Sequence, residues 1–368
     1  MKRDRFFLLN LILVLALAVG GCTRSRAAQP AATAQAATAT PAARVASRPL
    51  AAPLVATVPA APAKEETAPL DQVVEPVAVA ESATVPLVLP PLSRTVNILL
   101  LGSDRRPYEG DWRTDVLMLI ALDVEGHQAA AISFPRDMYL DEIPGHKPNK
   151  INVVDFLGER DDPGNGSDLL ASILEEKIGV SIHYFLRFEF ESFKQVVDAL
   201  GGVEIAVECR VYEYLLEEDI NLYLEPGTHR LAGKIALSYV RARNQGGDLE
   251  RARRQQRMVL AVRDQLLAEN QLPHLPALYA ALNNSVQTDI GFVDAIRFAR
   301  FALNLSEDDI HGMVIAPPDM VRSGWRGGMS VWLADWLLIA EQIQKVFDRP
   351  PLLETNTVGV QGDRVKCP

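Results

Sequence analysis

The chain has 368 residues and a formal net charge of −10 at pH 7. A net negative charge repels polyanions, so we do not expect nucleic acid as a partner. The length would allow two domains, but the first quarter of the chain is unsuited to forming a core, and we therefore expect one folded domain.

The N-terminus has the pattern of an export signal. Basic residues at its start precede an apolar run from Phe6 to Val19, which is shorter than the roughly 20 residues of a spanning helix. The run ends at Val19-Gly20-Gly21-Cys22, which resembles a bacterial lipobox. We expect residues 1–22 to be a signal peptide whose Cys22 carries a lipid anchor. The mature protein would then sit at the outer face of the cytoplasmic membrane; a retained signal anchor is the alternative.

Two cysteines remain once Cys22 is set aside. Cys209 and Cys367 form an even pair, and an exported address would allow a disulfide between them. The alternative is a buried thiol at Cys209, within a strand-like segment from Val203 to Val211. No spacing of cysteine and histidine residues indicates a zinc site.

Residues 23–94 are predicted to be a tether. From Thr23 to Pro91 the composition is dominated by Ala, Pro, Thr and Val, with no glycine and no acidic residue before Glu65. Such chains tend toward polyproline II at about 3.1 Å per residue, which gives a reach on the order of 200 Å if extended. A low-complexity segment without a spacing role is the alternative.

The folded domain is predicted to span residues 95–350, followed by a tail at 351–368. Apolar runs indicate strands at Val96–Leu101, Val116–Leu122, Ala129–Phe134, His183–Phe188, Val203–Val211 and His311–Ile315. Helical patterns occupy Ser167–Lys177, Glu189–Leu200, Leu231–Leu237, Leu249–Leu267, Val293–Leu303 and Val331–Phe347. An α/β fold with a central mixed sheet flanked by helices, an α/β sandwich, accounts for this alternation.

Charged residues gather at neighbouring strand ends. Asp104 follows the first strand and Asp115 begins the second, and the end of an open sheet borders its ligand crevice. Two carboxylates there suit Mg²⁺, with substrate phosphates completing the shell. Alternatively, both aspartates bond turns or cap helices, as loop aspartates often do. The third strand adds Arg136 and Asp137 to the same edge, and Lys150-Ile151-Asn152 follows.

The densest group of cations follows Tyr239. Arg241 and Arg243 precede a helix that we expect Asp248 to cap. At about 100° per residue, one arc of this helix carries Asp248, Arg251, Arg254 and Gln255, followed by Met258, Val262 and Leu266. Arg253 and Arg257 point away from this arc and are expected to be solvated.

This helix face therefore runs from guanidinium groups to hydrocarbon. Arginine forks bind phosphate oxygens, and an apolar floor beyond them would take a lipid chain. The alternative is that Met258, Val262 and Leu266 are ordinary core residues while the arginines pair with carboxylates.

Six motifs, in this order, resemble the LytR-CpsA-Psr domain. They are Gly102-x-Asp104 with Arg113-Thr114-Asp115, Ser133-Phe134-Pro135-Arg136-Asp137, Lys150-Ile151-Asn152, Val197-Asp198-x-Leu200-Gly201-Gly202-Val203, Tyr239-x-Arg241-x-Arg243 and Asp248-x-x-Arg251-x-x-Arg254-Gln255-Gln256. Each motif is common by itself, whereas the ordered set is specific. The resemblance is close from Thr95 to Leu267 and thinner beyond.

The resemblance implies an α/β sandwich with a hydrophobic pocket for a polyprenyl tail and an arginine-lined mouth for its pyrophosphate. It implies that Asp104 and Asp115 hold Mg²⁺. The phosphate contacts that it implies are Arg113, Arg136, Arg241, Arg243, Arg251 and Arg254, with Gln255 beside them. A carboxylate such as Asp137 or Asp248 is a candidate base for the acceptor hydroxyl; the alternative is that both only orient arginines.

The implied reaction moves a glycan phosphate from a polyprenyl-linked donor to a hydroxyl of peptidoglycan or another wall glycan. Phosphoryl transfer mainly requires positioned charge, which explains the residue types. A hydrolase that uses water as the acceptor and a non-catalytic lipid or polysaccharide binding module are the alternatives. The chain departs from the family's usual pattern in its lipobox, where many relatives have a spanning helix, and in its long Ala/Pro tether.

Overall fold

The computed structural model describes residues 91–355, apart from 107–109, 216–218, 244–245 and 268–285. The predicted signal peptide, Cys22 and almost all of the predicted tether lie outside the described residues. Within the described ranges, no helix combines the length and the hydrophobicity needed to cross a bilayer.

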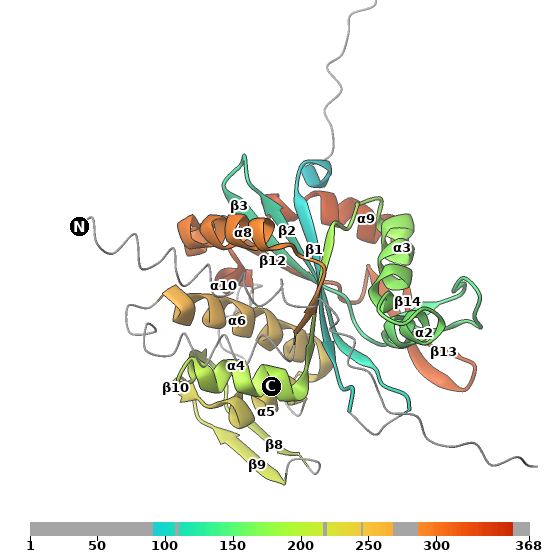
Figure 1. The fold of residues 1–368 in the computed structure, drawn as a ribbon. Coiled ribbons are helices and arrows are strands. Elements are labelled where there is room, and N and C mark those ends of the chain that lie inside the picture. Colours follow the sequence, from blue (N-terminus) through green and yellow to red (C-terminus); the bar gives the residue numbers. More distant parts are fainter. Residues whose placement is uncertain (1–90, 107–109, 216–218, 244–245, 268–285, 356–368) are drawn as a thin grey trace, which may run out of the picture. The chain divides into compact units, whose positions relative to one another are not determined.

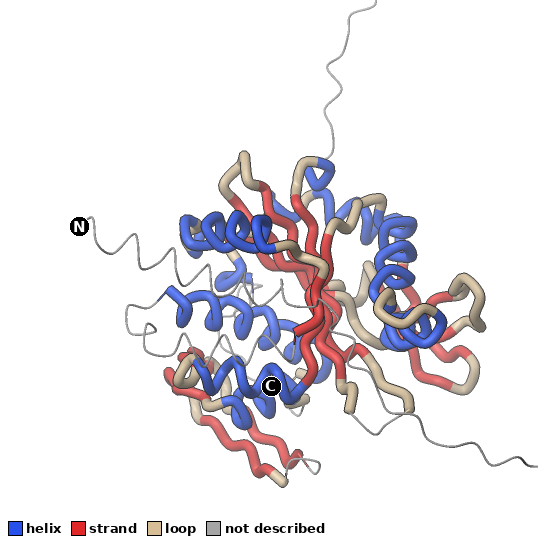
Figure 2. Tube along the Cα trace, viewed as in Figure 1, coloured by secondary structure: helices blue, strands red, loops and turns tan. Residues whose placement is uncertain are grey.

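A six-stranded sheet forms the centre of the domain (Figure 1; Figure 2). Its strands, in spatial order, are β11 (Val286–Thr288), β6 (Tyr184–Glu189), β1 (Val96–Ser103), β2 (Thr114–Asp123), β3 (Gln128–Ser133) and β12 (Ile310–Val314). Strands β1 and β6 are parallel, as are β3 and β12, and the other neighbours are antiparallel. The prediction of a central mixed sheet is confirmed.

Helices cover both faces of this sheet (Figure 1). On one side lie α2 (Val154–Asp161), α3 (Gly166–Ile178) and α9 (Trp336–Gln344), and on the other α6 (Gly247–Leu267), α8 (Phe292–Asn304) and α10 (Leu352–Thr355). Successive strand residues point to opposite faces, so Leu99 and Leu119 join the first core while Ile98 and Met118 join the second. These central strands are apolar because both of their faces are buried.

A third core lies beside the sheet, on the side of α6. It is built from α4 (Phe190–Ala199), α5 (Gly233–Arg241), and two small antiparallel sheets that pair β7 (Val203–Val207) with β10 (Gly227–Leu231) and β8 (Val211–Leu215) with β9 (Ile220–Leu224). Gly201 and Gly202 separate α4 from β7 with φ angles of 71° and 91°, which glycine adopts without strain. The two glycines therefore allow the turn that leads from α4 into β7.

Short elements complete the fold. They are η1 (Pro91–Ser93), β4 (Tyr139–Leu140), β5 (Asn149–Lys150), η2 (Ile151–Val153), η4 (Glu307–Asp309), β13 (Val321–Arg326), β14 (Met329–Ala334) and η5 (Val346–Asp348). Leu92 of η1 is buried in the first core. The helix α10 lies beyond residue 350, where the folded domain was predicted to end.

Two element predictions are wrong. The predicted strand Val203–Val211 is two strands in separate sheets, because β7 pairs with β10 while β8 pairs with β9. The alternation of buried and exposed residues continues through the connection between them. The predicted helix Val331–Phe347 begins as β14, and α9 starts only after Asp335, whose carboxylate accepts from the Leu338 N–H at 3.0 Å. That N-cap explains where the helix begins.

Cys209 lies in the connection between β7 and β8, not inside a strand. It is disulfide-bonded, so the alternative of a buried free thiol is wrong. The predicted pairing with Cys367 lies outside the described residues.

Candidate active site

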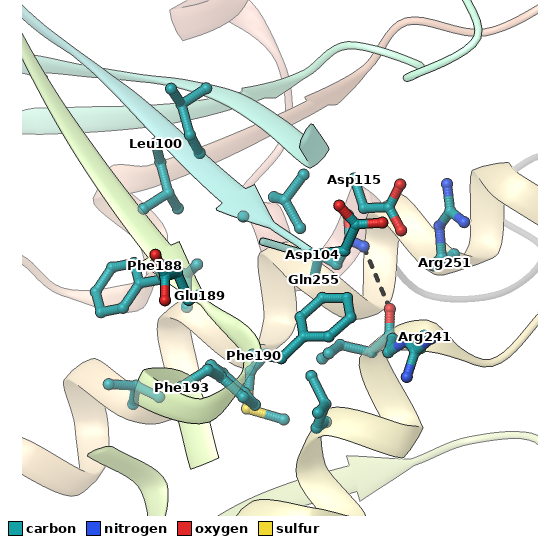
Figure 3. A pocket seen from close by; sticks show the side chains of 18 of the residues that line it. Leu100, Asp104, Asp115, Phe188, Glu189, Phe190, Phe193, Arg241, Arg251 and Gln255 are labelled. Atoms are coloured by element: carbon teal, nitrogen blue, oxygen red, sulfur yellow. Dashed lines mark hydrogen bonds between the residues drawn. The ribbon is translucent and has the colours of Figure 1, made fainter. Parts of the chain in front are cut away.

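A cavity of about 630 Å³ lies between the central sheet and the helices α4, α5 and α6. Its lining divides into an apolar part and a polar rim. The apolar residues are Leu100, Leu101, Val116, Leu186, Phe188, Phe190, Phe193, Val196, Leu215, Leu237, Val240, Met258, Val259, Val262 and Leu266. Figure 3 shows Phe188 and Phe193 on one side, with Glu189 beside Phe188, and Asp104, Asp115, Arg241 and Arg251 on the other.

The apolar wall is assembled from several elements of the chain. Strands β1 and β6 supply Leu100 and Phe188, α4 supplies Phe193, and α6 supplies Met258 and Val262. The structure therefore places the predicted lipid-contacting residues Met258, Val262 and Leu266 in the cavity wall. They also belong to the third core or pack against it, so they are core residues and cavity lining at once.

Asp104 and Asp115 lie side by side at the polar rim (Figure 3). The antiparallel pairing of Ser103 with Thr114 brings the end of β1 next to the start of β2. The Asp104 carboxylate accepts from the backbone N–H of Arg113. Burial raises the pKa of Asp104, and the negative charge of Asp115 raises it further, against the lowering effect of the Arg113 N–H bond.

Arg136 joins this acidic pair from the loop after β3. Its Nη1 donates to Asp115 at 2.5 Å, and its Nε lies 3.9 Å from Asp137. Lys150 Nζ holds Asp137 at 2.8 Å. The predicted charged strand ends thus form one connected group at the rim.

The arginines from α5 and α6 complete the rim. Arg241 lies with its guanidinium 4.6 Å from the centre of the Phe190 ring. The Arg251 side chain is only 7% exposed, and its Nη2 lies 3.3 Å from Asp248. Burial lowers the pKa of Arg251, because the charged guanidinium loses solvation there. Gln255 lines the cavity beside them and donates to the carbonyl of Val240 at 3.2 Å.

Three expectations about the helix α6 need correction. Asp248 is not its N-cap, since α6 already begins at Gly247. The Asp248 carboxylate instead holds Arg243 at 3.2 Å and Arg251 at 3.3 Å. Arg257 is not solvated, because its side chain is 11% exposed and pairs with Glu208 at 3.0 Å.

Arg254 also departs from its predicted position. It is buried outside the cavity lining, its Nη2 donates to the Ala242 carbonyl, and its guanidinium lies 5.8 Å from the Tyr239 ring centre. The arc of one ideal helix grouped Arg254 with Arg251, but α5 packs against α6 and covers that part of the arc. The structure therefore brings together all the predicted rim residues except Arg254, while Asp248 lies just behind them.

The apolar wall outside α6 was not predicted from the sequence. The unforeseen lining residues include Phe188, Phe190, Phe193, Glu213 and Arg263. Phe190, Phe193 and Val196 recur at helical spacing, which was a detectable signal for one apolar face of α4. Glu213 gave no signal, because a hairpin that was not predicted carries it.

The fold and the site together define an α/β domain whose apolar cavity opens under a rim of arginines and paired aspartates. Such a site suits an amphiphile with an anionic head, because guanidinium forks bind phosphate oxygens and the cavity removes hydrocarbon from water. The LytR_cpsA_psr family model matches residues 71–346. The chain belongs to this family, as its motifs predicted.

Two curated relatives are similar to part of the chain. The transferase TagT of Bacillus subtilis, named polyisoprenyl-teichoic acid–peptidoglycan teichoic acid transferase, is 29% identical over 57% of this chain and 64% of its own length. TagU of Oceanobacillus iheyensis, a transferase of the same name, is 34% identical over 53% of this chain and 59% of its own length. The chain thus spans less than two thirds of these relatives.

Solved structures of TagT share the fold. TagT bound to LI-WTA has a TM-score of 0.54 at 23% identity, covering 71% of this chain and 93% of that one. TagT with bound octaprenyl pyrophosphate lipid has a TM-score of 0.50 at 22% identity, with the same coverage. These likenesses confirm the α/β sandwich.

Proposed function

We propose that this protein transfers a glycan phosphate from a polyprenyl pyrophosphate carrier to a hydroxyl of peptidoglycan or another wall glycan. A phosphodiester forms at the acceptor oxygen, which loses its proton, the pyrophosphate bond of the donor breaks, and polyprenyl phosphate is released. The observation that carries the proposal is the continuity of the arginine rim with an apolar cavity of about 630 Å³. A polyprenyl pyrophosphate has the matching division into charged head and hydrocarbon tail. The names of the TagT and TagU relatives, and the octaprenyl pyrophosphate bound to TagT, support this choice of donor.

In this proposal the donor head lies against the rim while its tail enters the cavity. Arg241, Arg243 and Arg251 contact the phosphates, and Asp248 keeps two of these guanidiniums in place. Arg113 and Arg136 approach from the sheet side. Their combined positive charge compensates the charge that develops on the phosphoryl oxygens in the transition state.

Asp104 and Asp115 are the proposed ligands of a Mg²⁺ ion. Their adjacency suits a cation. The repulsion between the two carboxylates helps to raise the pKa of the half-buried Asp104, and a positive charge between them would relieve that repulsion. Among the described residues no group of three or more His, Cys, Asp or Glu is arranged for a metal, so substrate phosphates and water would complete the shell. When bound, Mg²⁺ would neutralise phosphate oxygens.

The two candidate bases differ little in their surroundings. Asp137 is held by Lys150 and lies near Arg136, and Asp248 is held by Arg243 and Arg251. Because each carboxylate is engaged by two cationic side chains, we assign both aspartates to orienting the cations, and assign neither as the base.

We further propose that Cys22 carries a lipid anchor and that the tether lets the domain reach the membrane-bound donor. The anchor would keep the protein at the outer face of the cytoplasmic membrane, where both the donor and the wall acceptor are exposed. This part of the proposal rests on the lipobox-like sequence alone.

The test is a transfer assay with the full-length protein in detergent, a lipid-linked glycan and Mg²⁺, with and without an oligosaccharide acceptor. A phosphate-linked adduct supports transfer. Free glycan phosphate as the sole product, with acceptor present, would show a hydrolase instead. Turnover that survives Asp104→Ala or Arg241→Ala would contradict the proposed site, and lipid binding without any turnover would indicate a binding module.

A further inference from the structure

A buried ion pair lies behind the acidic rim, on the opposite face of the sheet. Arg187 of β6 has a side chain that is 2% exposed, and Asp155 of α2 is fully buried. Arg187 Nη2 donates to Asp155 Oδ1. Because strand side chains alternate, Leu186 and Phe188 face the cavity while Arg187 faces α2.

The second oxygen of Asp155 reaches the strand that carries the site. Thr114 Oγ1 donates to Asp155 Oδ2 at 3.3 Å, and the Thr114 side chain is fully buried. Thr114 stands between Arg113 and Asp115, both of which line the cavity. The Asp155 carboxylate therefore connects β6 to the first residue of β2 from behind the sheet.

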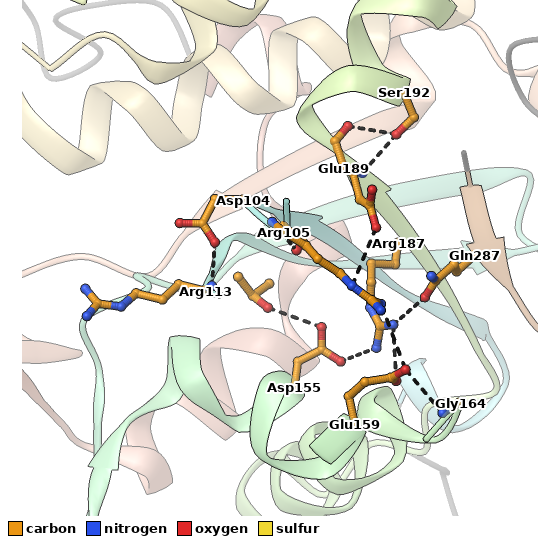
Figure 4. A network of polar contacts seen from close by, with 12 residues as sticks. Asp104, Arg105, Arg113, Asp155, Glu159, Gly164, Arg187, Glu189, Ser192 and Gln287 are labelled. Carbon is orange, nitrogen blue, oxygen red and sulfur yellow. Dashed lines mark hydrogen bonds and ion pairs between the residues drawn. The ribbon is translucent and has the colours of Figure 1, made fainter. Parts of the chain in front are cut away.

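Other side chains hold the Arg187 guanidinium in place (Figure 4). Its Nη1 donates to Gln287 Oε1 at 2.5 Å and lies 3.5 Å from Glu159 Oε2, while the Trp112 ring centre is 5.4 Å away. A buried ion pair is seldom more stabilising than apolar packing of the same volume. The directional bonds of this ion pair fix the position of the first residue of β2, which apolar packing would not do.

The strand pairing needs such support at this point. The register of β1 against β2 is irregular between Gly102 and Ser103, just where Asp104 and Asp115 emerge from their strands. The ladder therefore constrains the start of β2 less firmly than its middle. The bond from Thr114 to Asp155 supplies a second constraint at this position.

We infer that Thr114 and the Asp155–Arg187 ion pair are positioning residues that fix the Asp115 carboxylate relative to Asp104. Because Asp104 and Asp115 are Mg²⁺ ligands only in the proposed function, this role rests on that function. None of the three positioning residues is among the cavity-lining residues.

A pair of substitutions at Thr114 gives the sharpest test. Thr114→Val removes the hydroxyl and keeps the branched shape, whereas Thr114→Ser keeps the hydroxyl. Calorimetric titration of the metal-free, full-length protein with Mg²⁺ should show a dissociation constant raised by about tenfold or more in Thr114→Val. Thr114→Ser should bind Mg²⁺ nearly as the unmodified protein does. Amide exchange at residues 114 and 115 should accelerate in the valine variant alone.

Asp155→Asn tests the same link from the other side, since it keeps the side-chain shape but removes the charge. We expect it to weaken Mg²⁺ binding in the same direction. Asp123→Asn is the matched control: this buried carboxylate at the other end of β2 accepts from Gly126 N–H at 2.8 Å and from Gln128 at 3.2 Å. It should lower thermal stability without changing Mg²⁺ affinity.

Two results would overturn the positioning role, and they are distinguishable. If Thr114→Val lowers the melting temperature but binds Mg²⁺ and exchanges its amides as the unmodified protein does, the network is merely structural and the proposed function is unaffected. If the unmodified protein shows no Mg²⁺ binding, the proposed metal site fails, and the positioning role fails with it.

Discussion

The carboxylates of Asp104 and Asp115 line the same end of the cavity and are held in different ways. Arg136 donates from its side chain to Asp115, while Asp104 accepts from the backbone N–H of Arg113. Burial and the charge of Asp115 raise the pKa of Asp104. The stability of the metal-free protein therefore probes this pair.

We expect Asp104→Asn to melt at a higher temperature than the unmodified protein at pH 7 without Mg²⁺. The folded pKa of Asp104 is raised, mainly by burial and further by Asp115, so its stabilising contribution is present below the unfolded pKa and lost as pH rises through the folded pKa. The asparagine side chain is neutral at every pH, so it carries no unfavourable buried charge at pH 7, and its oxygen still accepts from the Arg113 N–H. A gain of about 1–3 °C is expected, vanishing at acid pH; an equal or lower melting temperature at pH 7 would contradict it.

Arg241 and Arg254 should respond differently to substitution. Arg241 lines the cavity, and Arg241→Ala should lower kcat/KM for a lipid-linked donor by about 100-fold or more. Arg254 donates to the Ala242 carbonyl, so Arg254→Met should mainly lower the melting temperature. Its effect on kcat/KM for the donor should be much smaller than that of Arg241→Ala. Steady-state kinetics and thermal unfolding of both variants provide the check. A larger kinetic effect at Arg254 would restore its predicted phosphate contact.

A bulky side chain at Val262 should block the inner part of the cavity. Val262→Trp is expected to weaken binding of a long-chain polyprenyl pyrophosphate by about tenfold or more, since each buried CH₂ contributes about 0.8 kcal/mol. A short-chain analogue should bind nearly unchanged, because its head still meets the arginines. Calorimetry with both chain lengths is the measurement. Equal losses for both lengths would place the tail elsewhere.

Cys22→Ala should release the protein from the membrane if the lipobox is used. Labelled fatty acid should be incorporated into the unmodified protein and not into the variant, and fractionation should show the change of location. Incorporation without Cys22, or firm membrane attachment of an unlabelled variant, would favour the retained signal anchor.

The central strands could be recognised without coordinates because they are buried on both faces. Leu99, Leu119 and Ile132 belong to unbroken apolar runs, and such runs leave little choice of structure. The break between β7 and β8 was not detectable, since the alternation of buried and exposed residues passes through the connection unchanged. Residues 203–211 show that periodicity reports burial and not which strand pairs with which.

The sequence alone was sufficient to predict the family, the mixed sheet and the charged groups at the strand ends, because motif spacing and apolar periodicity are local properties. Tertiary packing decided the rest. It separated Arg254 from Arg251, bringing α5 over one part of an arc that looked continuous on a helix. It also brought Phe188, Phe193 and Met258 into the wall of one cavity that no single element contains. Contacts between elements distant in sequence depend on how the helices pack, and local patterns carry no record of that packing.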